Sequence, residues 1–292
     1  FKNCVSFNCL ETPYWWDNGD LSHEIIYDGC VAALSKFVNG AGSTPKRKSN
    51  AFMLGMGDDN ECINCVSVGG SLNYTSSGHT TGAYLWDEGN EGIWKFENCL
   101  SHSDFVGIRN WQNTHRNHVI TNFDSYNNLL GIFHGAYMNS YTYRGGYHYN
   151  SKIEVKASSS NTSGVRFEHI IIDGASKIDF PLVILDAPIQ TADEFQTNKF
   201  LFCTVKNFTK GPVVGSSIFK TNSDSRKLKF VDFICCDLGG KLPTYDAYAE
   251  NGCWMRVQPV NGQAKLIEKV GPAESNNGTV KVSDIAPFAS KI

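Results

Sequence analysis

A dense group of aromatic, histidine and arginine side chains lies between Arg109 and His148 of the 292-residue sequence. Cleavage of a polysaccharide needs either two carboxylates for hydrolysis, or a base and a cation that neutralises a uronate for elimination. His134 or Tyr137 would abstract the proton, while Arg109 or Arg144 neutralises the substrate carboxylate. Arg109, His134 and Tyr137 are therefore the catalytic candidates. An aromatic surface whose histidines carry no chemistry explains the same composition and stays open.

Three acidic turns form a second candidate site, at residues 17–20, 58–61 and 87–91. If these turns stack on one another, their carboxylates repel and their pKa values rise unless a cation lies between them. Hard oxygen ligands on loops suit Ca²⁺, which is the only cofactor we expect. The alternative is a set of solvated turns that point apart. The candidate metal ligands are Asp58, Asp59, Asp87 and Glu88.

Each acidic turn follows a short aromatic segment, and five such segments align by their glycine and aromatic positions: residues 12–17, 50–55, 82–87, 107–112 and 131–136. This alignment places Arg109 in the column of Tyr84. If the column faces outward, it forms an aromatic strip that stacks on sugar rings, as the cost of burying an arginine favours. If it faces inward, it is a core stack, and both alternatives stay open. The carbohydrate-binding candidates are Tyr14, Trp16, Tyr84, Trp86 and Trp111.

These segments belong to a repeat whose clearest copies are residues 1–6 (FKNCVS), 62–67 (CINCVS) and 96–101 (FENCLS). Together with diverged copies, its first positions are 1, 27, 62, 96, 120, 141, 167, 200 and 230. Irregular spacing of this kind is typical of a β-solenoid, in which strands stack in register and loops vary. We therefore expect an all-β fold, a right-handed parallel β-helix of about nine coils over residues 1–237. Residues 238–292 lack the repeat and are expected to form a C-terminal β cap.

Two columns of the repeat predict local structure. Asparagine recurs at positions 3, 64, 98 and 122, with Gly29 in the second coil, which indicates a ladder of left-handed residues at a bend. Cysteine follows the first four of these bends, and neighbouring coils bring such residues within disulfide distance. Buried cysteines that act as small apolar residues are the alternative. The disulfide candidates are Cys4, Cys30, Cys65 and Cys99.

Composition narrows the location and the partners. The net charge of −3 gives no reason to expect nucleic acid or an anionic membrane, and no apolar run is long enough to span a bilayer. Ten cysteines and four Asn-x-Ser/Thr sequons favour a secreted or cell-surface glycoprotein. The chain begins within a strand motif, so we expect upstream coils or a removed targeting segment. The glycosylation candidates are Asn73, Asn161, Asn207 and Asn277.

Residues 9–113 resemble the β-helical region of G8-domain extracellular proteins, which include hyaluronan-degrading proteins, and more broadly the pectate-lyase-like β-helices. The resemblance is carried by residues 12–19 (TPYWWDNG), 49–54 (SNAFML), 64–71 (NCVSVGGS), 81–86 (TGAYLW) and 96–103 (FENCLSHS). It covers about a third of the chain, and the G8 module itself is absent. The resemblance implies extracellular glycan binding or depolymerisation with Ca²⁺, and it assigns no catalytic residue.

Two functions follow as expectations. The first is binding of an anionic extracellular polysaccharide along the aromatic strands, with depolymerisation by a lyase or hydrolase mechanism left open. The second is a non-catalytic structural or adhesive solenoid, such as a surface stalk or a filament subunit that assembles through its coil ends.

Overall fold

The computed structural model describes residues 1–10, 12–15, 23–35, 50–55, 57–70, 82–86, 92–110, 118–134, 141–156, 165–176, 183–186, 197–208, 213–215, 230–245, 253–270 and 279–285. Every regular element in these ranges is a β-strand. Within the same ranges, no helix is long and apolar enough to cross a membrane. The expectation of an all-β chain is therefore confirmed for the described residues.

The strands form three sheets, which we number 1, 2 and 3 in the order of β2, β3 and β4, one strand from each sheet. Sheet 1 has eleven strands: β2 (Ile26–Asp28), β5 (Asn60–Ile63), β8 (Trp94–Glu97), β11 (His118–Thr121), β14 (Tyr141–Arg144), β17 (Arg166–Glu168), β20 (Thr197–Leu201), β23 (Phe230–Cys236), β25 (Cys253–Pro259), β26 (Lys265–Val270) and β27 (Thr279–Asp284). Sheet 2 has eight strands: β1 (Val5–Phe7), β3 (Val31–Ala33), β6 (Val66–Val68), β9 (Leu100–His102), β12 (Asp124–Tyr126), β15 (Tyr147–Tyr149), β18 (Ile171–Asp173) and β21 (Thr204–Lys206). Sheet 3 also has eight: β4 (Asn50–Leu54), β7 (Gly82–Trp86), β10 (Val106–Asn110), β13 (Leu130–His134), β16 (Lys152–Lys156), β19 (Val183–Asp186), β22 (Val213–Gly215) and β24 (Thr244–Tyr245).

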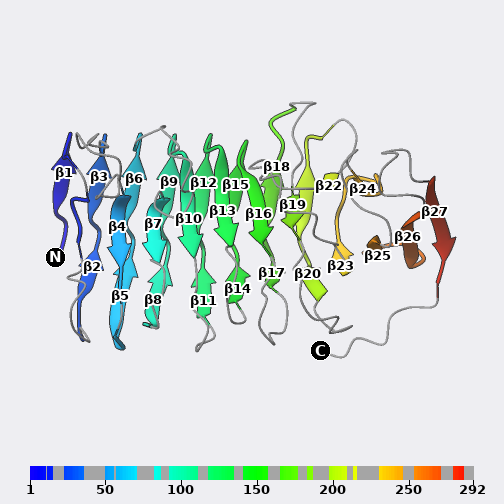
Figure 1. The fold of residues 1–292 in the computed structure, drawn as a ribbon, viewed down its shortest axis with the longest axis horizontal. Helices are drawn as coiled ribbons and strands as arrows, with labels where there is room; N and C mark the ends of the chain where they lie inside the picture. Colours follow the sequence, from blue (N-terminus) through cyan, green and yellow to red (C-terminus); the bar gives the residue numbers. More distant parts are fainter. Residues whose placement is uncertain are drawn as a thin grey trace, which may run out of the picture.

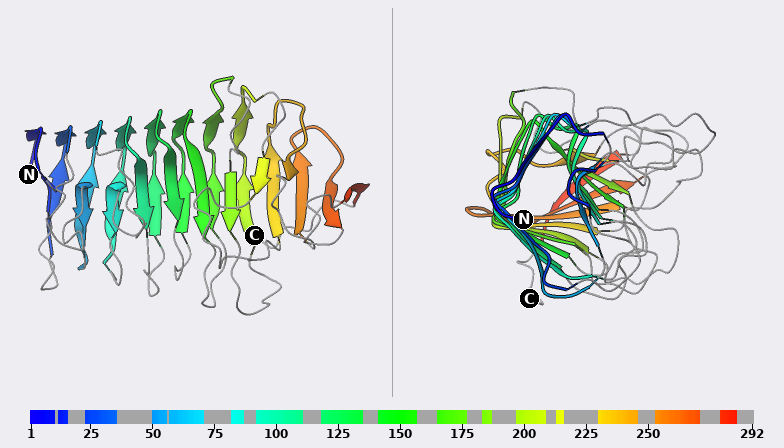
Figure 2. Two further views of the ribbon diagram at one scale, coloured as in Figure 1. Left: turned by 45° about the horizontal axis from the view of Figure 1, so that its top comes forward. Right: turned by 90° about the vertical axis from the view of Figure 1, so that its left-hand side faces the viewer.

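Over most of the chain, each sheet takes every third strand, so one consecutive strand from each sheet makes up what we call a coil. Figure 1 shows the strands following one another along the long axis, and the right-hand view of Figure 2 looks down the stack onto its three sides. This order fits a parallel β-solenoid. The pairing stays parallel as far as β23 and β25, and it becomes antiparallel between β25, β26 and β27. Beyond residue 237, β24 and β25 still pair in parallel with β22 and β23, although the repeat phrase has faded there.

The interior is built from columns of side chains that the repeat places in register. On the inner face of sheet 1, Tyr143, Phe167, Phe200 and Phe233 stack in successive coils with ring centroids 5.2, 4.6 and 5.0 Å apart. All four rings are buried. Stacked aromatic pairs add stabilisation beyond the area that they bury. Tyr143 and Phe233 occupy this column where the sequence predicted positions 141 and 230, so these two predicted repeat starts are corrected by two and three residues.

The bend between sheets 1 and 2 is the asparagine ladder that the sequence predicts. Asn64, Asn98 and Asn122 have φ of 56°, 54° and 48°. The Asn122 amide donates to Asn98 Oδ1 at 3.1 Å, and the Asn98 amide donates to Asn64 Oδ1 at 3.5 Å. At the corresponding position Gly29 has φ of 63°, and a Cβ there would lie 2.4 Å from Asn3 Oδ1. The ladder is therefore confirmed.

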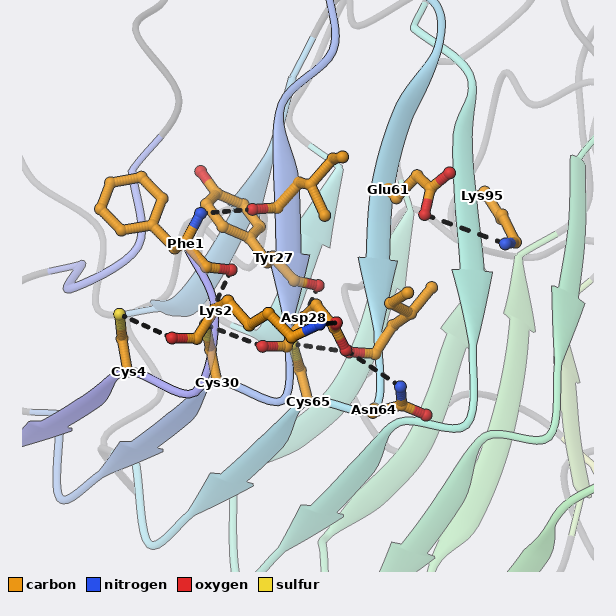
Figure 3. A network of polar contacts seen from close by, with 12 residues as sticks. Phe1, Lys2, Cys4, Tyr27, Asp28, Cys30, Glu61, Asn64, Cys65 and Lys95 are labelled. Carbon is orange, nitrogen blue, oxygen red and sulfur yellow. Dashed lines mark hydrogen bonds and ion pairs between the residues drawn. The ribbon is translucent and has the colours of Figure 1, made fainter.

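The cysteine column follows the ladder and points into the interior (Figure 3). All nine cysteines whose side chains the structure describes are free thiols, including Cys4, Cys30, Cys65 and Cys99. The thiols donate to backbone carbonyls of the preceding coil, as Cys65 does to Tyr27 at 3.4 Å and Cys99 does to Cys62 at 3.5 Å. Our expectation of at least one disulfide in this column is thus corrected, because these thiols behave as small buried residues.

Candidate functional site

The aromatic strands predicted to bind carbohydrate face the interior. Tyr14, Tyr84 and Trp86 have exposed fractions of 5%, 0% and 0%. The Tyr84 hydroxyl donates to the carbonyl of Cys65 at 2.7 Å. The aromatic rings of this column face inward, which is the second of the two alternatives. The prediction that these three rings bind carbohydrate is therefore wrong. Trp16 and Trp111 lie outside the described residues.

Arg109 does not share a column with Tyr84. It pairs with Leu85 and Phe133, whereas Tyr84 pairs with Ile108, one position away from our alignment. The alignment equated Gly82 with Gly107, but Gly107 is required by packing, since a Cβ there would lie 2.5 Å from the Gly131 carbonyl oxygen. Arg109 is buried, and its guanidinium carbon lies 4.5 Å from the centre of the Phe133 ring.

His134 lies in the interior, on the other face of the sheet from Arg109. Its Nδ1 is 3.0 Å from the Tyr143 hydroxyl, which also accepts a 2.7 Å hydrogen bond from the Asn110 amide. Burial, with a smaller effect of His118, lowers the pKa of His134 to about 3. A buried imidazole of this kind does not meet an external polymer, so its role as the catalytic base is corrected. Tyr137 lies outside the described residues.

The remaining predicted residues are only partly described. Asp58 is half-buried and Asp59 is exposed, while Asp87 and Glu88 lie outside the described residues. In the part of the chain that the structure describes, no three metal-ligating side chains are close enough to hold an ion. Asn207 is exposed, and its amide donates to Asp173 Oδ1 at 2.8 Å. Asn73, Asn161 and Asn277 are outside the described ranges, and both calcium and glycosylation stay predictions.

A different group of aromatic side chains does come together at the surface, on the outer face of sheet 2. In each short strand the middle residue points inward and is buried, as Ser101, Ser125 and His148 are. The flanking residues then face outward, because side chains alternate along a strand. We call this group the tyrosine face: His102, Asp124, Tyr126, Tyr147, Tyr149, Asp173 and Lys206.

Four of its rings form one contiguous cluster across β9, β12 and β15. The Tyr126 ring lies 5.7 Å from the Tyr147 ring and 6.3 Å from the Tyr149 ring. The Tyr147 and Tyr149 rings are 6.4 Å apart, and His102 stacks on Tyr126 at 6.3 Å. All four side chains are partly exposed. The register of the parallel strands thus holds several amphipathic rings at one surface.

Two carboxylates lie at opposite ends of Tyr147. Asp124 Oδ1 accepts a 2.7 Å hydrogen bond from the Tyr147 amide, and the Tyr147 hydroxyl donates to Asp173 Oδ2 at 2.6 Å. The second bond raises the pKa of Tyr147 to about 12. Lys206 Nζ is 3.7 Å from Asp173 and 5.1 Å from the centre of the Tyr147 ring. These contacts fix both the ring and the acids in one geometry.

The pKa values of the two acids are shifted in opposite directions. Burial raises the pKa of Asp124, and the Tyr147 amide only partly opposes that effect. Burial would raise the pKa of Asp173 too, but bonds from Tyr147, Asn207 and the Ala175 amide, with the charge of Lys206, hold it below its usual range. Asp173 is therefore held in its ionised form by four partners. Asp124 accepts a single hydrogen bond, from the Tyr147 amide.

Tyr126 and Tyr147 lie within the aromatic-rich stretch between Arg109 and His148, but the tyrosine face was not predicted from the sequence. The signal was the series of outward–inward–outward triplets after each left-handed residue, which read DSY at 124–126 and YHY at 147–149. Three residues are too few to reveal a period by themselves.

No family model, curated protein or solved structure matches the chain. The candidate site accordingly rests on its own geometry. Partly exposed tyrosines with hydrogen-bonding carboxylates can stack on sugar rings and accept bonds from sugar hydroxyls.

Proposed function

We propose that the chain binds an extracellular polysaccharide through the tyrosine face. The observation that carries this proposal is the cluster of Tyr126, Tyr147 and Tyr149, which are held partly exposed on the outer face of sheet 2 by the register of the coils. A tyrosine ring has an apolar face for the C–H groups of a sugar and a hydroxyl that stays wet. A polymer can lie across such a face, because the rings come from two successive coils.

We further propose that the coils wind as a right-handed β-helix and that β25, β26 and β27 form its C-terminal cap. Parallel strands of one sheet are joined by right-handed crossovers in about 98% of cases. The antiparallel strands cover the last parallel strand, whose edge would otherwise be open to pairing. Secretion or display at the cell surface stays part of the proposal, supported by the sequons and by the resemblance to G8-domain proteins.

Replacing Tyr126 or Tyr149 by alanine tests the binding proposal. Each substitution removes one stacking ring, so we expect affinity for the bound glycan to fall about 2- to 10-fold. Affinity electrophoresis of the whole chain against a panel of immobilised polysaccharides measures this. Val119→Ala is the matched control, because Val119 is 47% exposed on sheet 1, away from the tyrosine face.

Unchanged affinity in both tyrosine variants, with binding by the parent chain intact, would remove the tyrosine face from the proposal. Loss of affinity in Val119→Ala to the same extent would show that the effect is not specific to this face.

A further inference from the structure

We infer that the glycan bound at the tyrosine face is electrically neutral, with Asp124 as the residue that selects it. This inference rests on the proposed function and reverses the expectation, made from the sequence, of an anionic polymer. It follows from the charges on the face, from the free hydrogen-bonding capacity of one carboxylate, and from the direction of the bonds that it can make.

The charges around the rings are unfavourable for an anion. Asp124 and Asp173 both face the rings, and Lys206 is the single lysine or arginine on the outer face of the described strands of sheet 2. Lys206 is already engaged, by Asp173 at 3.7 Å and by the Tyr147 ring at 5.1 Å. A uronate or sulfate group stacked on these tyrosines would therefore meet a negative charge with no available cation to offset it.

The hydrogen-bonding capacity of the two acids is unequal. Asp173 accepts bonds from the Tyr147 hydroxyl, the Ala175 amide and the Asn207 side chain, at 2.6, 2.9 and 2.8 Å. Asp124 accepts one bond, to Oδ1 from the Tyr147 amide. Among the described residues nothing donates to Asp124 Oδ2, so this oxygen of a partly exposed side chain is the acceptor left for a ligand.

An ionised carboxylate can only accept hydrogen bonds, so the ligand group at Asp124 must donate one. A sugar hydroxyl donates, and its bond to a charged acceptor is stronger than a bond between neutral groups. A uronate or sulfate at the same point only accepts, and it is repelled. Asp124 therefore favours a neutral sugar over an anionic one by both effects.

The experiment compares neutral xylan, glucomannan and β-glucan with anionic hyaluronan, polygalacturonate and alginate, using the whole chain at low and high salt. We expect binding to at least one neutral polymer, with little dependence on salt. Asp124→Asn keeps an acceptor of the same shape and removes the charge. It should weaken neutral binding about fivefold, the difference between a charged and a neutral hydrogen bond, and strengthen any residual anionic binding. Glu97→Gln on the outer face of sheet 1 is the matched control and should change neither.

Tighter binding of anionic polymers that is lost in Tyr126→Ala would overturn the inference while leaving the proposed function in place. Neutral binding that Asp124→Asn leaves unchanged would also overturn it, by removing Asp124 from recognition. Binding to neither class, by protein shown to be folded by circular dichroism, would overturn the proposed function itself.

Discussion

Two histidines buried in the solenoid interior make its stability depend on pH. Burial lowers the pKa of His148 to about 3, as it does for His134, and His148 Nδ1 is held 2.7 Å from the Ser125 hydroxyl. In the unfolded chain a histidine takes up a proton below about pH 6.5. The unfolded state therefore binds more protons between about pH 6.5 and 3. The contribution of the two neutral, buried histidines to the free energy of unfolding is fully present above pH 6.5, and it is lost as the pH falls toward 3.

We predict that the free energy of unfolding falls between pH 7 and pH 5, by up to about 1.4 kcal/mol per pH unit for each histidine. Urea unfolding at several pH values measures the slope. His148→Asn should make the slope shallower, because the variant lacks one buried imidazole. An identical slope in His148→Asn and in the parent chain would contradict the assignment.

At the scale of elements, the asparagine ladder combines a backbone requirement with side-chain bonds that join the coils. Asn98 needs a left-handed conformation, with φ of 54°, and exchanges amide bonds with both neighbours in the ladder. Alanine is strained in this conformation by about 1–2 kcal/mol, whereas glycine is not. The two substitutions therefore separate the backbone from the side-chain contribution.

We expect Asn98→Ala to destabilise the chain by about 2 kcal/mol and Asn98→Gly by about 1 kcal/mol. The midpoint of chemical denaturation gives both values. Equal losses of unfolding free energy in the two variants would mean that the side-chain bonds dominate. No loss in either variant would contradict the prediction that the ladder stabilises the fold.

The elements also show which features could be predicted from the sequence. The first coils and the ladder were predictable, because asparagine and glycine at a left-handed bend are local requirements that recur there. In later coils His169, Phe202 and Cys235 take the same left-handed conformation, which their residue types do not predict. The register of sheet 3 could not be predicted. Gly107 is a glycine because Gly131 and Phe123 pack against it, and it does not mark the repeat position that Gly82 marks. The tyrosine face was missed, because which side of a three-residue strand faces outward depends on the coils around it.

At the scale of the whole molecule, each coil is paired mainly with the coils before and after it. In such arrays stability is a sum of terms between neighbours, and the ends open before the middle. Among the described strands, the first strand of sheet 2, β1, pairs with β3 alone, and Val5 and Phe7 are 72% and 69% exposed. Central strands such as β11 have a parallel neighbour on both sides.

We therefore predict that backbone amides of β8, β11 and β14 exchange with deuterium about tenfold or more slowly than those of β1. Hydrogen exchange followed by mass spectrometry of the intact chain resolves this. Uniform protection along the stack would contradict the array description and indicate one cooperative unit.

The reversal of strand direction at β26 gives the molecule two unlike ends (Figure 1). At one end, β1, β2 and β4 are the outer strands of their sheets and all belong to parallel pairs. At the other end, the outermost strand of sheet 1 belongs to an antiparallel pair. Growth of a fibre from identical subunits requires that the tail of one fit the head of the next. Because β27 is antiparallel to β26, it again runs in the direction of β25, so a second copy stacked head to tail on the described strands of sheet 1 would place its β2 parallel to β27.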